Sequence, residues 1–138
     1  MAVTQQRFSI RTPGRGTIEI TEQVQQIVAH SEIEVGLCNV FLHHTGASLI
    51  MCENADPSVR HDLETFFSRI APDGDPAFIH VLEGPDDMSA HVRMVLTKTE
   101  LTMPITEGEC TLGRWQGIYL YEHRITPHTR DVTVTVFG

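Results

Sequence analysis

The sequence predicts an α+β fold: a compact single-domain sandwich of mostly antiparallel β-strands with two to three helices. Three observations predict this class. The chain has 138 residues, which fits one domain over residues 1–138. Short segments with the alternation of β-strands fill both ends of the chain. Amphipathic helical segments with recognisable start signals interrupt them, which gives the expected order ββα-ββ-αα-ββββ.

The first part of the chain predicts two strands and a helix. Residues 3–12 alternate weakly, as a strand does, and residues 17–20 form a second short strand. Thr21 is expected to be the N-cap of the helix that follows. Three apolar residues of this helix are expected to face inward: Val24, Ile27 and Val28.

Two further strands are expected over residues 35–53. Residues 35–44 carry apolar side chains at both odd and even positions, which predicts a strand buried on both faces. After the small residues Thr45 and Gly46, a second strand is expected over residues 47–53.

Two helices are predicted in the middle of the chain. Asp56 followed by Pro57 indicates a helix start, because an acidic cap and a proline in the first turn both favour one. Apolar residues from Val59 to Ile70 then share one helical face. A shorter helix is expected after Asp87. Its expected buried stripe consists of Met88, Val92, Val95 and Leu96.

The last third of the chain predicts four strands. Residues 101–105 alternate, but Pro104 restricts this strand to an edge or a bulge. Glu107 and Gly108 are expected to form a turn. The other three expected strands cover residues 109–112, 115–124 and 132–136.

Composition and charge exclude several classes of function. The formal charge of −8 argues against a general nucleic-acid binder and against docking on an anionic membrane. No signal-peptide core and no membrane-length apolar segment is present. The expected location is therefore the cytoplasm. The three cysteines form no metal or disulfide motif and are expected to be small buried residues: Cys38, Cys52 and Cys110.

Eight histidines are many for such a chain, and three of them stand in suggestive positions. His44 closes a strand before small residues that would let a ligand approach, although a core-edge histidine that is hydrogen-bonded to a carbonyl has the same pattern. His80 and His91 flank an acidic loop, as ligands of a divalent metal can. Their spacing matches no short metal motif, and Asp86 and Asp87 could simply cap the following helix.

The strand over residues 115–124 carries further candidates. Alternation places Gln116, Glu122 and Arg124 on one face. Glu122 and Arg124 could hold a metal and a phosphate, or could form a surface ion pair. Trp115 is more typical of a core anchor than of a stacking platform. Ser48 has no histidine–carboxylate partner visible in the sequence, so a serine triad is a remote option.

Several motifs occur in one register along the chain. They are His44-Thr45-Gly46-Ala47-Ser48-Leu49 with Glu53-Asn54, Asp56-Pro57-Ser58-Val59-Arg60-His61-Asp62, Asp86-Asp87-Met88-Ser89-Ala90-His91, and Gly113-Arg114-Trp115-Gln116-Gly117-Ile118 leading to Glu122-His123-Arg124. On these motifs the chain resembles the YjbQ family, also called the secondary thiamine-phosphate synthase family, almost from end to end. It departs from the family pattern at three positions, where Gly46 replaces a serine, Ser89 a proline and Arg114 a threonine.

The resemblance implies a fold, an assembly and an activity. It implies an α+β sandwich that forms homotrimers with clefts between subunits. It also implies a divalent metal, zinc or magnesium, held by His44, His80 and His91. The implied activity is a weak thiamine-phosphate synthase. That reaction joins hydroxymethylpyrimidine diphosphate to thiazole phosphate and releases pyrophosphate.

The expected site combines this metal with polar side chains of the motifs. The metal would stabilise the departing diphosphate as a Lewis acid. A phosphatase or lyase acting on a small phosphorylated metabolite would use the same parts, and so would a non-catalytic trimer that binds a metal or a metabolite. The expected roles are phosphate clamping by Arg60 or Arg124, ligand orientation or general base catalysis by Asp62 or Glu122, substrate positioning by Gln116, and further substrate contacts by Ser48, Asn54 and Trp115.

Overall fold

The computed structural model describes all 138 residues and contains eight strands and three helices in the expected order. The elements are β1 (Val3–Thr12), β2 (Gly16–Glu19), α1 (Thr21–Ser31), β3 (Val35–Leu42), β4 (Ala47–Glu53), α2 (Pro57–Ile70), α3 (Asp87–Leu96), β5 (Glu100–Thr106), β6 (Glu109–Cys110), β7 (Gln116–Glu122) and β8 (His128–Phe137).

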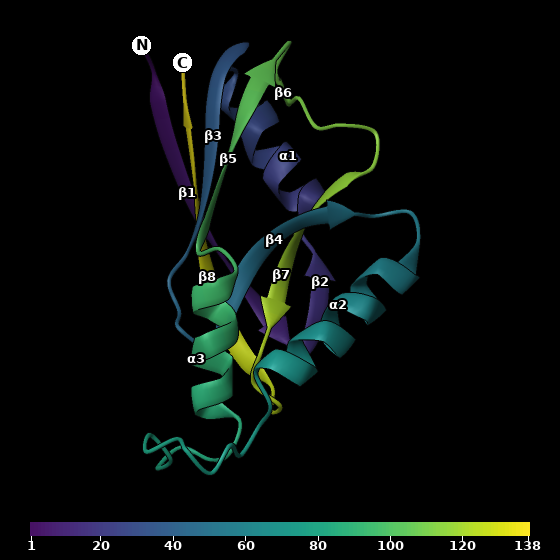
Figure 1. Ribbon diagram of the computed structural model, residues 1–138. Coiled ribbons are helices and arrows are strands. Elements are labelled where there is room, and N and C mark those ends of the chain that lie inside the picture. Colours follow the sequence, from purple (N-terminus) through teal and green to yellow (C-terminus); the bar gives the residue numbers. More distant parts are fainter.

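The strands form two antiparallel sheets, which confirms the predicted α+β class. One sheet has five strands in the order β1-β8-β3-β5-β6, and the other has three in the order β2-β7-β4. In Figure 1 the five-stranded sheet lies on the left, and the three-stranded sheet lies behind α2 and α3. The two chain ends lie side by side because backbone hydrogen bonds join Ala2 and Gly138.

The apolar core lies between the two sheets and α1. Val24, Ile27 and Val28 of α1 are buried in it, as predicted. Thr21, however, does not cap α1, because the N-cap residue is Ile20. The Thr21 hydroxyl instead accepts a hydrogen bond from the backbone N–H of Ile118 at 2.9 Å, so it joins the helix to β7.

Strand β3 is buried on one face only, so the prediction of two buried faces is wrong. Cys38, Val40 and Leu42 point into the core and are buried. The other face of the five-stranded sheet carries no helix or strand of this chain (Figure 1), which leaves apolar side chains at the surface. The exposed apolar residues of this outer face are Val3, Val35, Leu37 and Phe41.

Helix α2 begins as predicted but lies at the surface. Asp56 caps it by accepting a hydrogen bond from Ser58 N at 2.9 Å, and Pro57 occupies the first turn. None of its residues is fully buried, and Phe66 is half-exposed. Phe67 holds the helix on the three-stranded sheet through an edge-to-face contact with Tyr121, with ring centroids 6.0 Å apart.

Helix α3 has the opposite orientation to the predicted one. Its buried residues include the charged Asp87 and Arg93, whereas Val95 is 74% exposed and Leu96 is also exposed. The polar face is turned inward because it finds charged partners there. Arg93, for example, donates to both carboxylate oxygens of Glu64 at 2.8 and 3.0 Å. The apolar stripe of α3 therefore faces away from the chain's own core.

The remaining strands form in the predicted order, but their bounds differ: β6 ends at Cys110, and β8 begins at His128, four residues before the predicted start. Strand β5, which contains Pro104, lies between β3 and the short β6 rather than at the edge of the sheet.

One turn forms as predicted, and two side chains lie in surroundings that differ from the predicted ones. Glu107 and Gly108 both have positive φ (54° and 79°), which forms the predicted tight turn between β5 and β6. Trp115 is half-exposed, with the Arg114 guanidinium 4.8 Å from its ring centroid, so it is not a core anchor. Cys52 is only partly buried, unlike the other two cysteines.

None of the three helices combines the length and the apolar character that a membrane span requires.

Candidate metal site

Two histidines and an aspartate gather where the long loop over residues 71–86 meets α3. The ligand atoms of His80, Asp87 and His91 all lie within 4.8 Å of one another. The Asp87 Oδ2 atom is 2.9 Å from His80 Nε2 and 3.4 Å from His91 Nε2. The two imidazole rings meet at an angle of 63°, with their centroids 5.4 Å apart. Three side chains with metal-binding atoms thus converge on one small volume.

The local fold explains this convergence. Asp87 is the first residue of α3, and His91 follows four positions later. Side chains at these positions lie on the same helical face, one turn apart. The preceding loop brings His80 back over the start of the helix, where its Nε2 atom meets the Asp87 carboxylate. Two of the three donors therefore come from a helix and one comes from a loop.

The donor set fits a zinc-type cation. Zinc binds imidazole nitrogen and carboxylate oxygen at about 2.0–2.2 Å. In a tetrahedral site such bonds place neighbouring ligand atoms roughly 3.3 Å apart. The two distances to Asp87 Oδ2, 2.9 and 3.4 Å, lie on either side of this value. Magnesium favours oxygen ligands and several waters, so two imidazoles favour zinc over magnesium. Three protein ligands would leave one position open for water or substrate.

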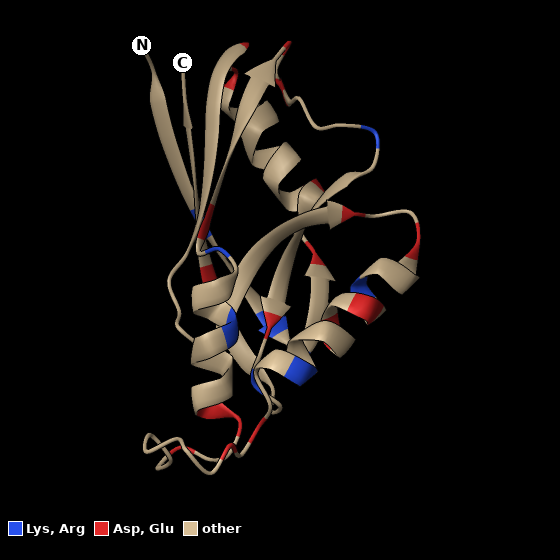
Figure 2. Cartoon of the chain, viewed as in Figure 1, with Lys and Arg blue, Asp and Glu red and all other residues tan.

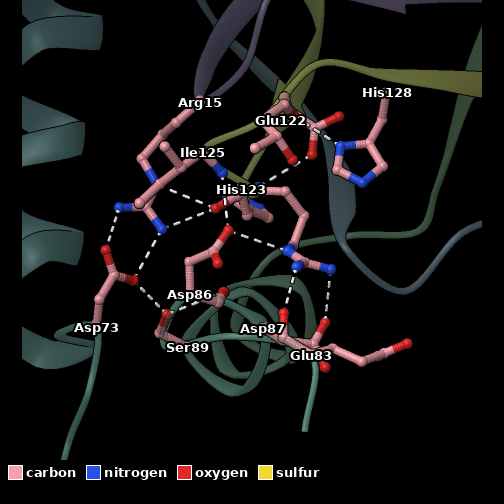
Figure 3. Close-up of polar contacts among 12 residues, drawn as sticks. Arg15, Asp73, Glu83, Asp86, Asp87, Ser89, Glu122, His123, Ile125 and His128 are labelled. Atoms are coloured by element: carbon pink, nitrogen blue, oxygen red, sulfur yellow. Dashed lines mark hydrogen bonds and ion pairs between the residues drawn. The ribbon is translucent and has the colours of Figure 1, made fainter. Parts of the chain in front are cut away.

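Arg124, just after β7, holds the end of the loop against the start of α3. Its Nη1 atom donates to Asp87 Oδ1 at 2.9 Å and its Nε atom donates to Asp86 Oδ2 at 3.0 Å. Its Nη2 atom donates to the backbone carbonyl of Glu83 at 2.8 Å. Asp86 also accepts a hydrogen bond from the backbone N–H of Ile125 (Figure 3). Each nitrogen of this guanidinium thus has a partner within the chain.

A second arginine holds the beginning of the same loop. Arg15 donates to both oxygens of Asp73, at 2.8 and 2.9 Å, and to the backbone carbonyl of His123 (Figure 3). Ser89 also donates to Asp73. Figure 2 shows acidic residues along this loop and at the start of α3. Two arginine contacts at the loop's ends thus tie an acidic segment to the end of β7.

The pKa of Asp87 reflects this environment. Burial acts to raise the pKa of the carboxyl group, but the charges of His91 and Arg124 act against it and prevail. The net shift is downward, so Asp87 stays an anion at neutral pH. The side chain of Asp87 is only 5% exposed. An ionised, buried carboxylate between two imidazoles is a suitable ligand for a divalent cation.

His44, the third predicted ligand, does not belong to this group within one chain. Its Nε2 atom accepts a hydrogen bond from the backbone N–H of Asp131 at 2.8 Å. Burial and the nearby charge of Arg130 lower the pKa of His44, so the ring is neutral. This arrangement agrees in part with the alternative of a core-edge histidine: the ring is hydrogen-bonded to the backbone, but to an N–H rather than to the expected carbonyl. Asp87 takes the third place; the sequence leaves it open between a carboxylate of the acidic loop beside the histidines and a helix cap, and its spacing of four from His91 is a further signal.

Glu122 lies on the core side of β7 rather than beside the histidines. It shares this side with Ile118 and Leu120, and it is fully buried. Arg130 donates to both of its oxygens at 2.7 Å, and the Thr12 hydroxyl donates to one of them at 2.9 Å. These contacts make Glu122 one half of a buried ion pair that joins the two sheets.

Ser48 has a histidine partner that the sequence did not reveal. Its hydroxyl lies 2.8 Å from His123 Nε2, and both residues are fully buried. The pairing of β4 with β7 brings them together, since Ser48 lies opposite Tyr121 and Ala47 opposite Glu122. The register between β4 and β7 therefore determines that Ser48 and His123 meet.

Burial of His123 predicts a pH-dependent stability. Burial, with the nearby charges of Arg93 and Arg15, lowers the pKa of His123 from 6.5 to about 3. The unfolded chain therefore binds more protons between these values, and stability is lost as the pH falls through this range. The free energy of unfolding is expected to drop by about 2 kcal/mol between pH 7 and pH 5. Urea unfolding at both pH values measures this drop. His123→Gln should lose most of it, and an unchanged drop in that variant would contradict the assignment.

Five other predicted site residues lie away from the histidine group. Gln116 begins β7, which extends over seven residues, so it lies roughly 20 Å from Glu122 at the other end. Arg60 lies near this far end, where it donates to the backbone carbonyl of Glu53 at 2.9 Å and stacks on Tyr119. The others are Asn54 and Trp115, which share a backbone hydrogen bond, and Asp62, which is exposed beside His61.

The three departures from the family pattern have different surroundings. A side chain at Gly46 would place its Cβ 2.8 Å from the tip of Arg130, so a serine would require that tip to move. Ser89 contributes the hydrogen bond to Asp73 that a proline could not make. Arg114 stacks on Trp115.

Comparison with known proteins identifies close relatives. The family described as UPF0047 protein YjbQ-like matches residues 6–138. The UPF0047 protein sll1880 of Synechocystis is 46% identical over 134 residues, which cover 97% of this chain and 91% of that protein. The UPF0047 protein YjbQ of Escherichia coli O157:H7 is 38% identical over 135 residues, covering 97% of each chain.

Solved structures show the same fold. A YjbQ/UPF0047 family protein from Clostridium acetobutylicum, described as uncharacterized, aligns with a TM-score of 0.88 at 32% identity. The alignment covers 96% of this chain and 99% of that one. The hypothetical protein APE1520 from Aeropyrum pernix K1 aligns with a TM-score of 0.89 at 25% identity, covering 98% of each.

Proposed function

The chain belongs to the UPF0047 YjbQ-like family, and we propose that it is a metal-dependent enzyme acting on a small phosphorylated metabolite. The proposed reaction is weak thiamine-phosphate synthesis, the activity implied by the family resemblance. In that reaction, hydroxymethylpyrimidine diphosphate and thiazole phosphate combine and pyrophosphate leaves. A location in the cytoplasm is part of the same proposal.

One observation carries the proposal: the convergence of His80, Asp87 and His91 on one point. These residues would hold the cation, and zinc suits them better than magnesium. A bound zinc-type ion supplies a Lewis acid and an open coordination position for water or a phosphate oxygen. The chain's own contribution is to keep Asp87 ionised and to hold its carboxylate in place through the Arg124 contact to Oδ1. His44 stays a predicted ligand that a second subunit would have to supply.

A second candidate function, non-catalytic metal binding, is favoured by the positions of the arginines. Arg124 is committed to carboxylates of its own chain, and Arg60 lies near the opposite end of β7. Neither guanidinium is free beside the histidine group to clamp a diphosphate. Within one chain, only the bound cation itself would then neutralise a departing diphosphate, and this is the point at which the two functions differ.

Removal of the metal separates the two functions. Protein purified without a histidine tag is expected to contain about one zinc-type ion per chain. Pyrophosphate release from the two thiamine precursors should fall at least about tenfold after chelation and return when zinc is restored. Metal binding without pyrophosphate release would leave only the binding function. Absence of metal, with none gained on reconstitution, would overturn both.

We also propose that the chain assembles with itself as a homotrimer. Two separate surfaces expose apolar side chains. One is the outer face of the five-stranded sheet, and the other includes Ile79, Leu82 and Val95 on the loop and α3. Contact between two different surfaces gives a head-to-tail interface, which can close into a ring. Light scattering should give about three times the chain mass of 15.5 kDa, and a monomer mass at micromolar concentration would contradict the proposal.

A further inference from the structure

We propose that Arg124 is a positioning residue that limits Asp87 to one metal-facing oxygen, and that it thereby makes the His80–Asp87–His91 group select zinc over calcium. This inference rests on the proposed metal site. It also gives Arg124 a role different from the phosphate clamp expected from the sequence.

The two oxygens of Asp87 have separate partners. Oδ1 accepts a hydrogen bond from Arg124 Nη1 at 2.9 Å. Oδ2 faces the Nε2 atoms of His80 and His91, at 2.9 and 3.4 Å. Because the Asp87 side chain is almost fully buried, water does not readily replace the arginine at Oδ1. As long as Arg124 stays in place, only Oδ2 is available to a cation.

Arg124 itself is fixed by three further contacts. Its backbone N–H donates to Glu122 Oε1 at 3.0 Å, which anchors it to the buried ion pair with Arg130. Its Nε and Nη2 atoms donate to Asp86 and to the Glu83 carbonyl. A guanidinium held by this many partners loses several hydrogen bonds if it turns toward a substrate. Its position favours a permanent role beside Asp87.

The number of available oxygens adds to the preference for zinc that the two imidazoles already give. Calcium takes six to eight oxygen ligands and commonly uses both oxygens of a carboxylate. Zinc needs about four ligands and accepts a single carboxylate oxygen beside imidazoles. Hydrogen bonds that orient a ligand commonly affect metal affinity by about 10–100-fold. Lysine cannot replace this arginine, because it carries a point charge and lacks the planar fork that contacts two carboxylates and a carbonyl.

The test compares Arg124→Gln and Arg124→Lys with the wild-type protein and with Arg15→Gln. Arg15 anchors the other end of the same loop but does not contact Asp87, so it is the matched control. Zinc and calcium affinities are measured by competition titration, and circular dichroism checks the fold. Cobalt(II) absorption reports coordination number, because four-coordinate cobalt absorbs far more strongly than six-coordinate cobalt.

Both Arg124 variants are expected to bind zinc about 10–100-fold more weakly, with a smaller zinc-to-calcium affinity ratio and a weaker cobalt band. Arg15→Gln should change zinc affinity less than about threefold. Unchanged zinc affinity and cobalt spectra in both Arg124 variants would overturn the inference while leaving the metal site intact. Equal losses in Arg15→Gln would also overturn it, since loop anchoring would then explain the effect. Failure of the wild-type protein to bind zinc would instead overturn the proposed function.

Discussion

His91→Ala is expected to weaken zinc binding by about 100-fold or more, the largest change in ligand affinity that this structure predicts. His91 supplies one of three converging donors, and its Nε2 atom lies 3.4 Å from Asp87 Oδ2. Structural zinc sites bind with about 10–16 kcal/mol from four ligands, so one ligand contributes roughly 3 kcal/mol. That energy corresponds to a loss of about 100-fold or more in affinity. Elemental analysis and zinc titration of purified protein measure this loss.

The matched control for this variant is His61→Ala. His61 is 79% exposed on α2 and lies outside the convergent group. It should keep the full zinc content and affinity of the wild-type protein. Equal zinc content in His91→Ala and wild-type protein, with both folded, would show that any bound ion lies elsewhere.

Glu122→Gln is expected to lower the free energy of unfolding by about 3–5 kcal/mol, the largest stability change that we predict. Glu122 is fully buried, and Arg130 contacts both of its oxygens at 2.7 Å. The substitution keeps the shape of the side chain but leaves the Arg130 charge buried without its counter-ion. Burial of an unpaired charge is costly because the protein interior solvates it poorly. Urea unfolding at pH 7 and a fixed protein concentration measures the change.

An exposed ion pair provides the comparison. Arg7 contacts Asp131 at 3.0 Å on the outer face of the five-stranded sheet, and its side chain is largely exposed. Arg7→Ala should therefore cost no more than about 1 kcal/mol. If Glu122→Gln cost as little as Arg7→Ala, the buried pair would not hold the two sheets together. In that case the general-base role that the sequence suggests for Glu122 would again need to be tested.

Most of the fold could be predicted because local patterns determine where elements begin and end. The bounds predicted for β1 and β4 match the structure, as does the start of α2 at Asp56 and Pro57. These local patterns do not determine which surface packs against the apolar stripe of a helix. Helix α3 is amphipathic as predicted, yet its polar face is buried, because Arg93 and Asp87 find charged partners on Glu64 and Arg124. Amphipathicity defines two faces of a helix but does not say which face meets the chain's own core.

The candidate site was only partly accessible from the sequence for the same reason. The sequence places His80 and His91 beside an acidic loop, and the structure brings them together. Asp87 belongs to the same acidic loop, but its sequence position does not separate a metal ligand from a helix cap, because a residue at a helix start can serve either purpose. Glu122 could not be placed without knowing that its side of β7 faces the other sheet. The partnership of Ser48 with His123 likewise depends on strand register, which alternation within one strand does not determine.

The most direct test of the proposed metal site is a crystal structure of zinc-loaded protein with an anomalous difference map measured at the zinc absorption edge. The predicted result is one peak per chain bound by His80 Nε2, Asp87 Oδ2 and His91 Nε2, at about 2.0–2.2 Å from each atom. No peak between these three residues, or a peak that only other residues bind, would contradict the assignment.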